Sequence, residues 1–280
     1  MSTKMATVHV AGEDYTAVQL LNKRAERLDE ILPGTAGITG AQLVRIAQFE
    51  LQRNTDLALC DPLSVLNAVY DAARLGLMLG REAHLVPYRE KCQMIPDYRG
   101  FVTLAYRSKL VTRIDAKLVF PQDQFTVEEG STMAIHHLPD YLIDRSNPEE
   151  ILYFYAIAWT VGAPVPVFHI MNRPEVDRIR ASSAMKNGIP WTKWYDRMGL
   201  KSAMKYLVDK RLPVTEIPGL SDLVEIDNRA EAGKVSRPLT GESDEELAGR
   251  IDEETQVRKE DLQMKLDDAK NRQREPGEEG

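Results

Sequence analysis

The apolar residues of the N-terminal part of the chain repeat with the period of an α-helix. Between about residues 15 and 31 they recur at spacings of three and four, at Val18, Leu21, Ala25, Leu28 and Leu32. Beyond a Pro-Gly stop, Thr39 and Gln42 form a capping-box pattern ahead of a second helix. A short apolar run at residues 6–10 predicts a strand before both. We therefore expect residues 1–38 to form a helical segment that is a candidate for contacts between copies of the chain.

A third helix has the clearest boundaries. Asp61 can cap it, Pro62 suits its first position, and Gly76 or Gly80 can end it. Its residues are apolar around most of its circumference, which is typical of a central buried helix. The two glycines are not followed by Gly-Lys-Ser/Thr, so the sequence does not predict a phosphate-binding loop.

Within residues 84–109 the spacing of the apolar residues changes from every second residue, as in a strand, to the three- and four-residue spacing of a helix. Two short alternating runs, 85–88 and 92–95, predict a hairpin whose turn is 89–91. Asp97 can then cap a helix with its apolar side at Phe101, Val102, Leu104 and Ala105. The polar positions of this unit carry cations and aromatic rings, at Arg89, Lys91, Arg99, Arg107, Lys109, Tyr88, Tyr98 and Tyr106.

The next part of the chain has the pattern of β-strands. Strand-like runs occur at 111–120, 124–128, 132–136, 151–160 and 165–171, with Pro and Gly between them. Short connections favour an antiparallel meander. The fold class expected is α+β, with an antiparallel β meander and hairpin packed against helices and with helical N- and C-terminal segments.

Residues 173–211 have helical spacing again, divided at Gly188-Ile-Pro190. In the second part a basic residue occurs at every fourth position, at Lys193, Arg197, Lys201 and Lys205, next to Trp194. Residues four apart share one side of a helix, so these cations form a stripe. We interpret the stripe as one wall of a groove, and ion pairs with the strands as the alternative.

The net charge of −7 belongs to the C-terminal end. Residues 222–280 hold 18 Asp and Glu against 10 Lys and Arg, whereas residues 1–221 hold 25 against 26. The composition predicts an acidic, largely disordered tail over 222–280 and a folded core over 39–221. Within the core, residues 86–117 carry 7 basic and 3 acidic side chains, and such local patches decide whether phosphates are attracted.

Several classes of protein are disfavoured by the sequence. No apolar run approaches the ~20 residues of a membrane span, and the N-terminus lacks a signal-peptide pattern, so we expect a soluble, intracellular protein with no membrane partner. Cys60 and Cys92 make no disulfide framework, and the His136-His137 pair lacks a third metal ligand at a recognisable spacing. No nucleophile with its base, carboxylate cluster or nucleotide loop is recognisable, which favours a binding protein that is not an enzyme and requires no cofactor.

Cations interleaved with aromatic rings are typical of a groove for single-stranded nucleic acid, where cations meet phosphates and rings stack on bases. The alternative is that the cations lie on a face that contacts only solvent and that the tyrosines belong to the hydrophobic core. The candidate DNA-binding residues are Arg89, Lys91, Tyr98, Arg99, Arg107, Lys109, Lys193, Trp194, Arg197, Lys201 and Lys205.

Four segments in order, DPLSVLNAVYDAARLGLMLGREAHLVPY, DYRGFVTLAYRSK, NRPEVDRIRASSA and WTKWYDRMGLKSAMKYLVDKRLP, resemble the RecT family of phage single-strand annealing proteins, relatives of Redβ. The likeness spans about residues 40–215. It implies ATP-independent binding of single-stranded DNA, pairing with a complementary strand, and assembly into rings or helical filaments. It also implies a phage exonuclease as partner and a place of action on DNA in the cytoplasm of a bacterial host.

The resemblance carries basic positions over to Arg99, Arg107, Lys201 and Lys205. The chain departs from the family pattern at Lys109, where glycine is common, and at Ser202, where threonine is usual. The departure at Lys109 predicts an altered turn after the helix that Asp97 can cap.

Two further interpretations stay open. The C-terminal tail is a candidate contact for the host's single-strand-binding protein. The alternative function is a self-assembling phage structural or scaffold protein without nucleic-acid function, and a nuclease is a third.

Overall fold

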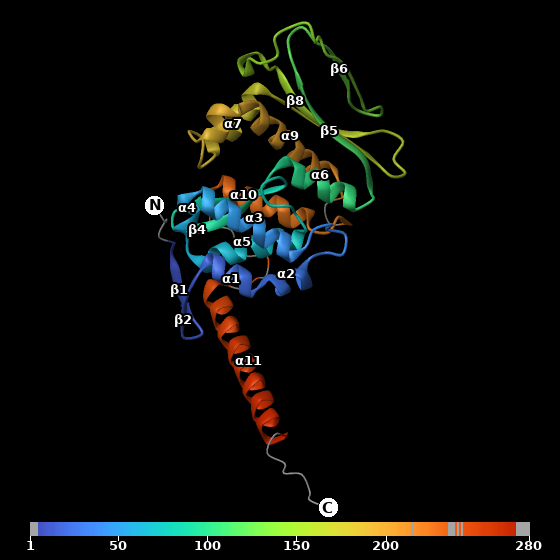
Figure 1. The fold of residues 1–280 in the computed structure, drawn as a ribbon. Helices are drawn as coiled ribbons and strands as arrows, with labels where there is room; N and C mark the ends of the chain where they lie inside the picture. The colour runs from blue at the N-terminus through green and yellow to red at the C-terminus, as the bar shows by residue number, and fades with distance from the viewer. Residues whose placement is uncertain (1–4, 214–215, 235–238, 240, 242, 273–280) are drawn as a thin grey trace, which may run out of the picture.

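The computed structural model describes residues 5–213, 216–234, 239, 241 and 243–272, and its fold is α+β, as the sequence predicts (Figure 1). The N-terminal part begins with a hairpin of β1 (Thr7–Val10) and β2 (Glu13–Thr16). Four helices follow: α1 (Ala17–Lys23), α2 (Ala25–Ile31), α3 (Gly40–Arg53) and α4 (Thr55–Ala58). The single helix expected over residues 15–31 is in fact two, because the backbone at Arg24 leaves the helical conformation.

Helix α5 (Pro62–Leu75) lies at the centre of this part, and its predicted boundaries are confirmed. Asp61 caps it, Pro62 begins it, and Gly76 ends it in the left-handed conformation at φ 63°. The predicted hairpin is also present, as β3 (Ala83–Tyr88) and β4 (Lys91–Pro96), with Tyr88 opposite Lys91. Its turn is therefore the dipeptide Arg89-Glu90, shorter than predicted by one residue.

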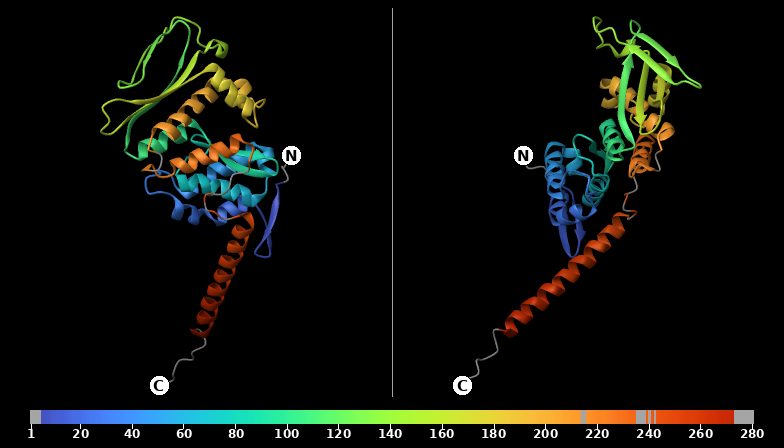
Figure 2. Two further views of the ribbon diagram at one scale, coloured as in Figure 1. Left: turned by 180° about the vertical axis from the view of Figure 1, so that it is seen from behind. Right: turned by 90° about the vertical axis from the view of Figure 1, so that its right-hand side faces the viewer.

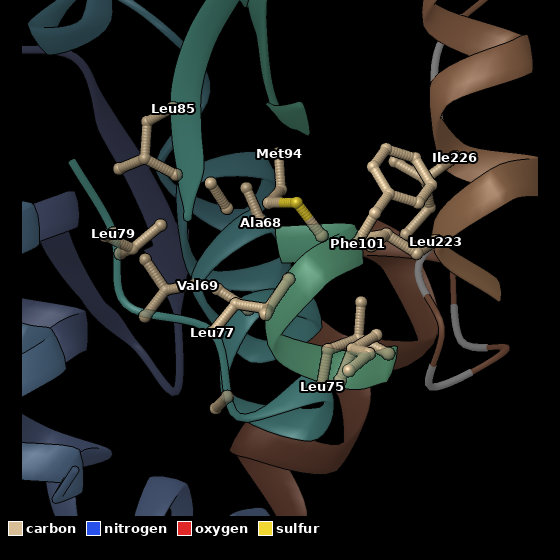
Figure 3. Close-up of a cluster of buried hydrophobic side chains, with 14 of the residues drawn as sticks. Ala68, Val69, Leu75, Leu77, Leu79, Leu85, Met94, Phe101, Leu223 and Ile226 are labelled. Carbon is tan, nitrogen blue, oxygen red and sulfur yellow. The ribbon is translucent and has the colours of Figure 1, made fainter. Parts of the chain in front are cut away.

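Helix α6 (Tyr98–Arg107) begins at the Asp97 cap and packs its apolar side against α5 and β4. Figure 3 shows Phe101 of α6 beside Met94 of β4, with Leu223 and Ile226 of α10 (Leu220–Glu231) on the other side. These side chains are almost completely buried. A segment that we expected to belong to a disordered tail thus completes the hydrophobic core.

The middle of the chain forms a three-stranded antiparallel sheet in the order β5 (Val111–Val119), β8 (Tyr153–Thr160), β9 (Val167–Asn172). A separate hairpin of β6 (Gln124–Glu128) and β7 (Ala134–Leu138) is inserted between β5 and β8, followed by a 3₁₀ turn at Pro148–Glu150. In a meander β5 would pair with β6, and that part of the prediction is wrong. Strand β5 pairs with β8 instead, and the β6–β7 hairpin forms a sheet of its own.

The two faces of this sheet have different coverings. Tyr155 and Ile157 of β8 form a cluster with Phe125 of β6, so the β6–β7 hairpin covers one face. Phe154 lies on the other face, against α9 (Tyr195–Arg211), where α7 (Arg173–Ser182) and α8 (Ile189–Lys193) also lie (Figure 1). A Cβ at Gly199 would lie 2.2 Å from the Phe154 ring, so only glycine permits this approach.

A buried polar cluster attaches the hairpin to the sheet. Asp123 is fully buried and accepts from Arg145 (2.6 Å) and from the Phe120 amide (2.8 Å), and it lies 3.0 Å from His137 Nε2. The other ring nitrogen of His137 lies 3.0 Å from the Tyr155 hydroxyl. Burial opposes ionisation of Asp123, but these partners outweigh it and lower its pKa. The role of His137 is therefore structural.

The C-terminal region is helical in the parts that the structure describes. Helix α11 (Asp244–Arg272) begins against the N-terminal part, where Leu247 and Ile251 are buried, and then projects away from the body (Figure 2). The prediction of a largely disordered tail over 222–280 is wrong for α10 and for the first turns of α11. Residues 235–238, 240, 242 and 273–280 lie outside the described part. Across the described helices, none is long and apolar enough to cross a membrane.

Candidate nucleic-acid interface

The predicted basic residues fall into three groups that differ in burial. Arg89, Arg99, Lys109, Lys193 and Arg197 are exposed; Lys91 is exposed but paired; and Arg107, Lys201 and Lys205 are engaged inside the fold. The aromatic candidates Tyr98 and Trp194 are partly exposed.

The first exposed cation lies at the tip of the β3–β4 hairpin. Arg89 takes a left-handed backbone (φ 58°) and its guanidinium lies 5.5 Å from the Tyr88 ring. The end of α10 meets this tip, since a Cβ at Gly233 would lie 3.1 Å from the Tyr88 hydroxyl and 2.8 Å from Ala184. The hairpin tip and the α7–α8 loop are therefore brought together by the end of α10.

A group of one aromatic ring and two cations lies just after that loop. Trp194 breaks the helix between α8 and α9 (φ −126°, ψ 39°), and it is 38% exposed. The Arg197 guanidinium lies 4.1 Å and the Lys193 ammonium 5.4 Å from its ring. We call Lys193, Trp194 and Arg197 the tryptophan platform. An indole with two cations at its side can offer a stacking surface and phosphate partners at one place.

Helix α6 carries exposed cations at both ends. Arg99 is in the first turn, where its amide donates to the Asp97 cap (3.0 Å) and its guanidinium lies 5.4 Å from the Tyr98 ring. Lys109 follows the last turn with φ 59°. Glycine adopts this left-handed conformation without strain, whereas Lys109 adopts it with a full side chain. The altered turn after α6 stays a prediction.

The C-terminal half of the basic stripe, Lys201 and Lys205, does not form the wall of a groove. Lys201 forms an ion pair with Asp227 of α10, and Lys205 forms ion pairs with Asp227 (3.2 Å) and Glu231. Lys205 is only 4% exposed and Asp227 is completely buried. The prediction that Lys201 and Lys205 face a DNA groove is wrong for this structure, because their charges are taken up by carboxylates from another helix.

Electrostatic attraction between the lysines and the carboxylates keeps both kinds of group ionised. Burial alone would lower the pKa of Lys205, but Asp227 and Glu231 outweigh it and raise the pKa. Burial would likewise raise the pKa of Asp227, but Lys201 and Lys205 outweigh it and lower the pKa. The sequence analysis gave ion pairs as the alternative to a groove wall, but it expected the partners of the lysines on the strands. The missed signal is the four-residue spacing of Asp227 and Glu231, which matches the spacing of the lysines.

Arg107 is also structural. Its guanidinium donates to the carbonyls of Leu75 (3.1 Å), Ala36 (3.1 Å) and Gly76 (2.7 Å), so it caps the C-terminal end of α5. Burial lowers its pKa. Three of its hydrogen bonds thus have a structural role, and the contact of Arg107 with DNA stays a prediction.

Lys91 has a carboxylate partner from the opposite end of the chain. Its ammonium pairs with Asp244 at the start of α11, and this hydrogen bond raises its pKa. The Asp244 carboxylate also accepts from Asn67 of α5 (2.7 Å). Lys91 could reach DNA only by giving up Asp244.

One cation and aromatic pair was overlooked in the sequence. Arg113 of β5 is exposed, and its guanidinium lies 4.9 Å from the ring of Trp159, its partner across the sheet on β8. The two residues are 46 positions apart, so only the strand register brings them together. Among the described residues, no group of three His, Cys, Asp or Glu side chains could hold a metal ion.

Comparison with known proteins identifies the family of the chain. Protein RecT of Escherichia coli (strain K12) is 29% identical over 201 residues, which cover 68% of this chain and 72% of that protein. The model of the RecT family matches residues 41–236. This range runs past the end of α10, so the helix that carries Asp227 and Glu231 lies within the matched residues. The chain belongs to the RecT family.

Proposed function

We propose that the protein binds single-stranded DNA and anneals it to a complementary strand during homologous recombination. Membership of the RecT family supports single-strand annealing, and it favours this function over the structural or scaffold alternative. The observation that carries the proposal is the tryptophan platform, where an exposed indole lies beside two cations.

The proposed interface has three exposed parts. The tryptophan platform and Arg89 lie on the side where the α7–α8 loop meets the hairpin tip, and Arg99 lies at the far end of the hairpin. A strand of six residues spans roughly 20 Å, so a DNA strand that touches both Arg89 and Arg99 would run along the hairpin. Lys201 and Lys205 act by building the surface and do not touch DNA.

The annealing mechanism follows from neutralisation of charge. Lys and Arg side chains that bind one phosphate backbone release its counterions and lower the repulsion of a second strand. Contacts to phosphate and sugar leave the base edges exposed for pairing. No bond is made or broken, so we propose that the reaction requires neither ATP nor another cofactor and that the protein is not an enzyme.

The proposal extends to partners. Many copies acting side by side, as a ring or filament, would hold a longer stretch of DNA than one chain can. The part of α11 from residue 256 to 267 is exposed and carries three acidic and three basic side chains. We assign it as the contact for a phage exonuclease or for the host's single-strand-binding protein, on DNA in the bacterial cytoplasm.

The test measures single-strand affinity as a function of salt. The double variant Lys193→Gln/Arg197→Gln should reduce the slope of log K against log salt by about 1.4, since each phosphate contact to a single strand contributes about 0.7. Trp194→Ala should weaken binding by about 1–3 kcal/mol for all sequences alike. Lys201→Met/Lys205→Met should leave the slope unchanged.

The matched control also removes two positive charges, but from α11. Arg258 and Lys265 are exposed on α11, and their replacement by glutamine should not alter the slope. Annealing of two labelled complementary oligonucleotides without ATP gives the second readout. An unchanged slope for the Lys193 and Arg197 variant, together with unchanged annealing, would show that the tryptophan platform does not bind DNA.

A further inference from the structure

The side of the molecule formed by the β6–β7 hairpin and the segment after it exposes large apolar side chains. Val127, Leu138, Tyr141, Leu142, Leu152 and Tyr153 are all exposed, and Leu142 is 97% exposed. Val127, Leu152 and Tyr153 line a cavity of about 410 Å³ together with Phe125 and Ile170. We call these six exposed residues the edge patch. Large apolar side chains exposed in one part of the chain mark a candidate site of association.

The surroundings of the edge patch are acidic. Residues 121–153 contain seven Asp and Glu and a single Arg. That arginine, Arg145, is already paired with Asp123 (2.6 Å) inside the fold. Glu128, Glu129 and Glu150 are exposed. An acidic rim repels DNA and favours a partner that has apolar side chains among positive charges.

The same chain presents such a surface. The α7–α8 loop exposes Met185 (40%) and Ile189 (68%), with the exposed Lys186 between them. Residues 173–211 hold 10 basic against 4 acidic side chains, and two of the basic residues, Lys201 and Lys205, are paired with carboxylates of α10. We call Met185, Lys186 and Ile189 the loop knob.

The loop knob is held in place before any partner binds. The Ala184 amide donates to the Glu231 carbonyl (2.9 Å), and the Gly188 amide donates to the Met185 carbonyl (2.7 Å). Arg180 also donates to the Lys186 carbonyl (3.3 Å). An ordered loop loses little conformational entropy on binding, which favours affinity.

The two surfaces lie on opposite sides of the central sheet. Side chains of successive residues on a strand point to opposite faces, so Tyr155 meets the β6–β7 hairpin while Phe154 meets α9. Figures 1 and 2 show the hairpin on one side of the sheet and α7 on the other. Complementary surfaces that face away from each other join copies head to tail, which produces rings or filaments.

We propose that the loop knob of one copy binds the edge patch of the next, with Ile189 and Met185 on the apolar side chains and Lys186 at the acidic rim. This inference rests on the proposed assembly into oligomers and names its surface. Because α8 continues directly into the tryptophan platform, each contact would place the DNA surface of one copy beside its neighbour, and a strand could pass from subunit to subunit.

The test uses one variant on each surface. Leu142→Arg changes the edge patch and Ile189→Glu changes the loop knob, at side chains so exposed that folding should be unaffected. Light scattering without DNA should show that each variant needs about 10- to 100-fold higher concentration to assemble than the unaltered protein. Leu59→Arg, at another exposed leucine (58%), is the matched control and should assemble normally.

Mixing the two variants tests the head-to-tail arrangement. Each variant retains one intact surface, so an equimolar mixture should form dimers but no longer assemblies. Affinity for an oligonucleotide short enough for one subunit should be the same in all variants, which separates this proposal from the proposed DNA site. Normal assembly of either variant, a monomeric unaltered protein, or a mixture that stays monomeric would overturn the proposal.

Discussion

Replacing Asp227 with alanine removes the carboxylate that Lys201 and Lys205 share. Asp227 is fully buried, Lys205 is 4% exposed, and Asp227 is the carboxylate to which Lys201 is paired. Removing one partner of a buried ion pair costs about 3–5 kcal/mol, because a charge is left without compensation. For a domain of this size each kcal/mol shifts the melting temperature by about 2–4 °C, so we expect a loss of about 10 °C.

The assay is thermal unfolding of the full chain followed by circular dichroism. The control is Asp261→Ala, which breaks the exposed Asp261–Lys265 pair (2.6 Å) on α11 and should cost less than about 1 kcal/mol. The triple variant Asp227→Leu/Lys201→Met/Lys205→Met should recover most of the loss, because apolar side chains of similar volume can replace buried ions. A melting temperature for Asp227→Ala equal to that of the control would refute the buried cluster.

The pH dependence of this loss follows from the directions of the pKa shifts. The folded-state pKa of Asp227 is lowered, so its contribution to stability is present above its ordinary value and is lost as pH falls through the lowered one. The folded-state pKa of Lys205 is raised, so its contribution is present below its ordinary value and is lost as pH rises through the raised one. The destabilisation by Asp227→Ala should therefore be the same at pH 5, 7 and 9.

Three further predictions concern single positions. Gly199→Ala, which would stabilise an ordinary helix, should lower stability by at least about 1–3 kcal/mol in urea unfolding, since its Cβ meets the Phe154 ring at 2.2 Å; restored stability in Gly199→Ala/Phe154→Leu would confirm the clash as the cause. Burial raises the pKa of Asp71 to about 7, so between pH 4 and 7 the folded state holds a proton that the unfolded state has lost, and stability should fall by up to about 1.4 kcal/mol per pH unit; Asp71→Asn should abolish this slope, and an unchanged slope would contradict the assignment. Lys109→Gly should raise the melting temperature slightly by removing the strain of φ 59°, whereas Lys109→Val should lower it, and the opposite order would contradict the turn geometry.

Signals from residues close together in the chain were sufficient to predict much of the secondary structure of the N-terminal part. The caps at Thr39, Asp61 and Asp97 fixed three helix starts, because each cap depends only on neighbouring residues. The insertion of β6–β7 between β5 and β8 could not be predicted in this way. Strand pairing at a separation of about 40 residues depends on tertiary packing, and the spacing of apolar residues is the same in a meander.

The candidate site shows the same division between local and distant contacts. The tryptophan platform was predictable, since Lys193, Trp194 and Arg197 lie within one helical turn of each other. The burial of Lys201 and Lys205 was not, because it depends on Asp227, more than 20 residues further along the chain. An excess of acidic residues suggested disorder there, although Asp227 is buried and both Asp227 and Glu231 are counter-ions of the lysines.

The contact of α10 with α9 determines how shortened forms of the chain will behave. A protein cut at residue 221 would lose the counter-ions of two ammonium groups together with the apolar side chains Leu223 and Ile226 that cover α6. The uncovered lysines would then hold any polyanion, heparin as readily as DNA. A rise in affinity after such a cut would therefore report damage to the core, and a cut after residue 234 is the one that tests the contribution of α11.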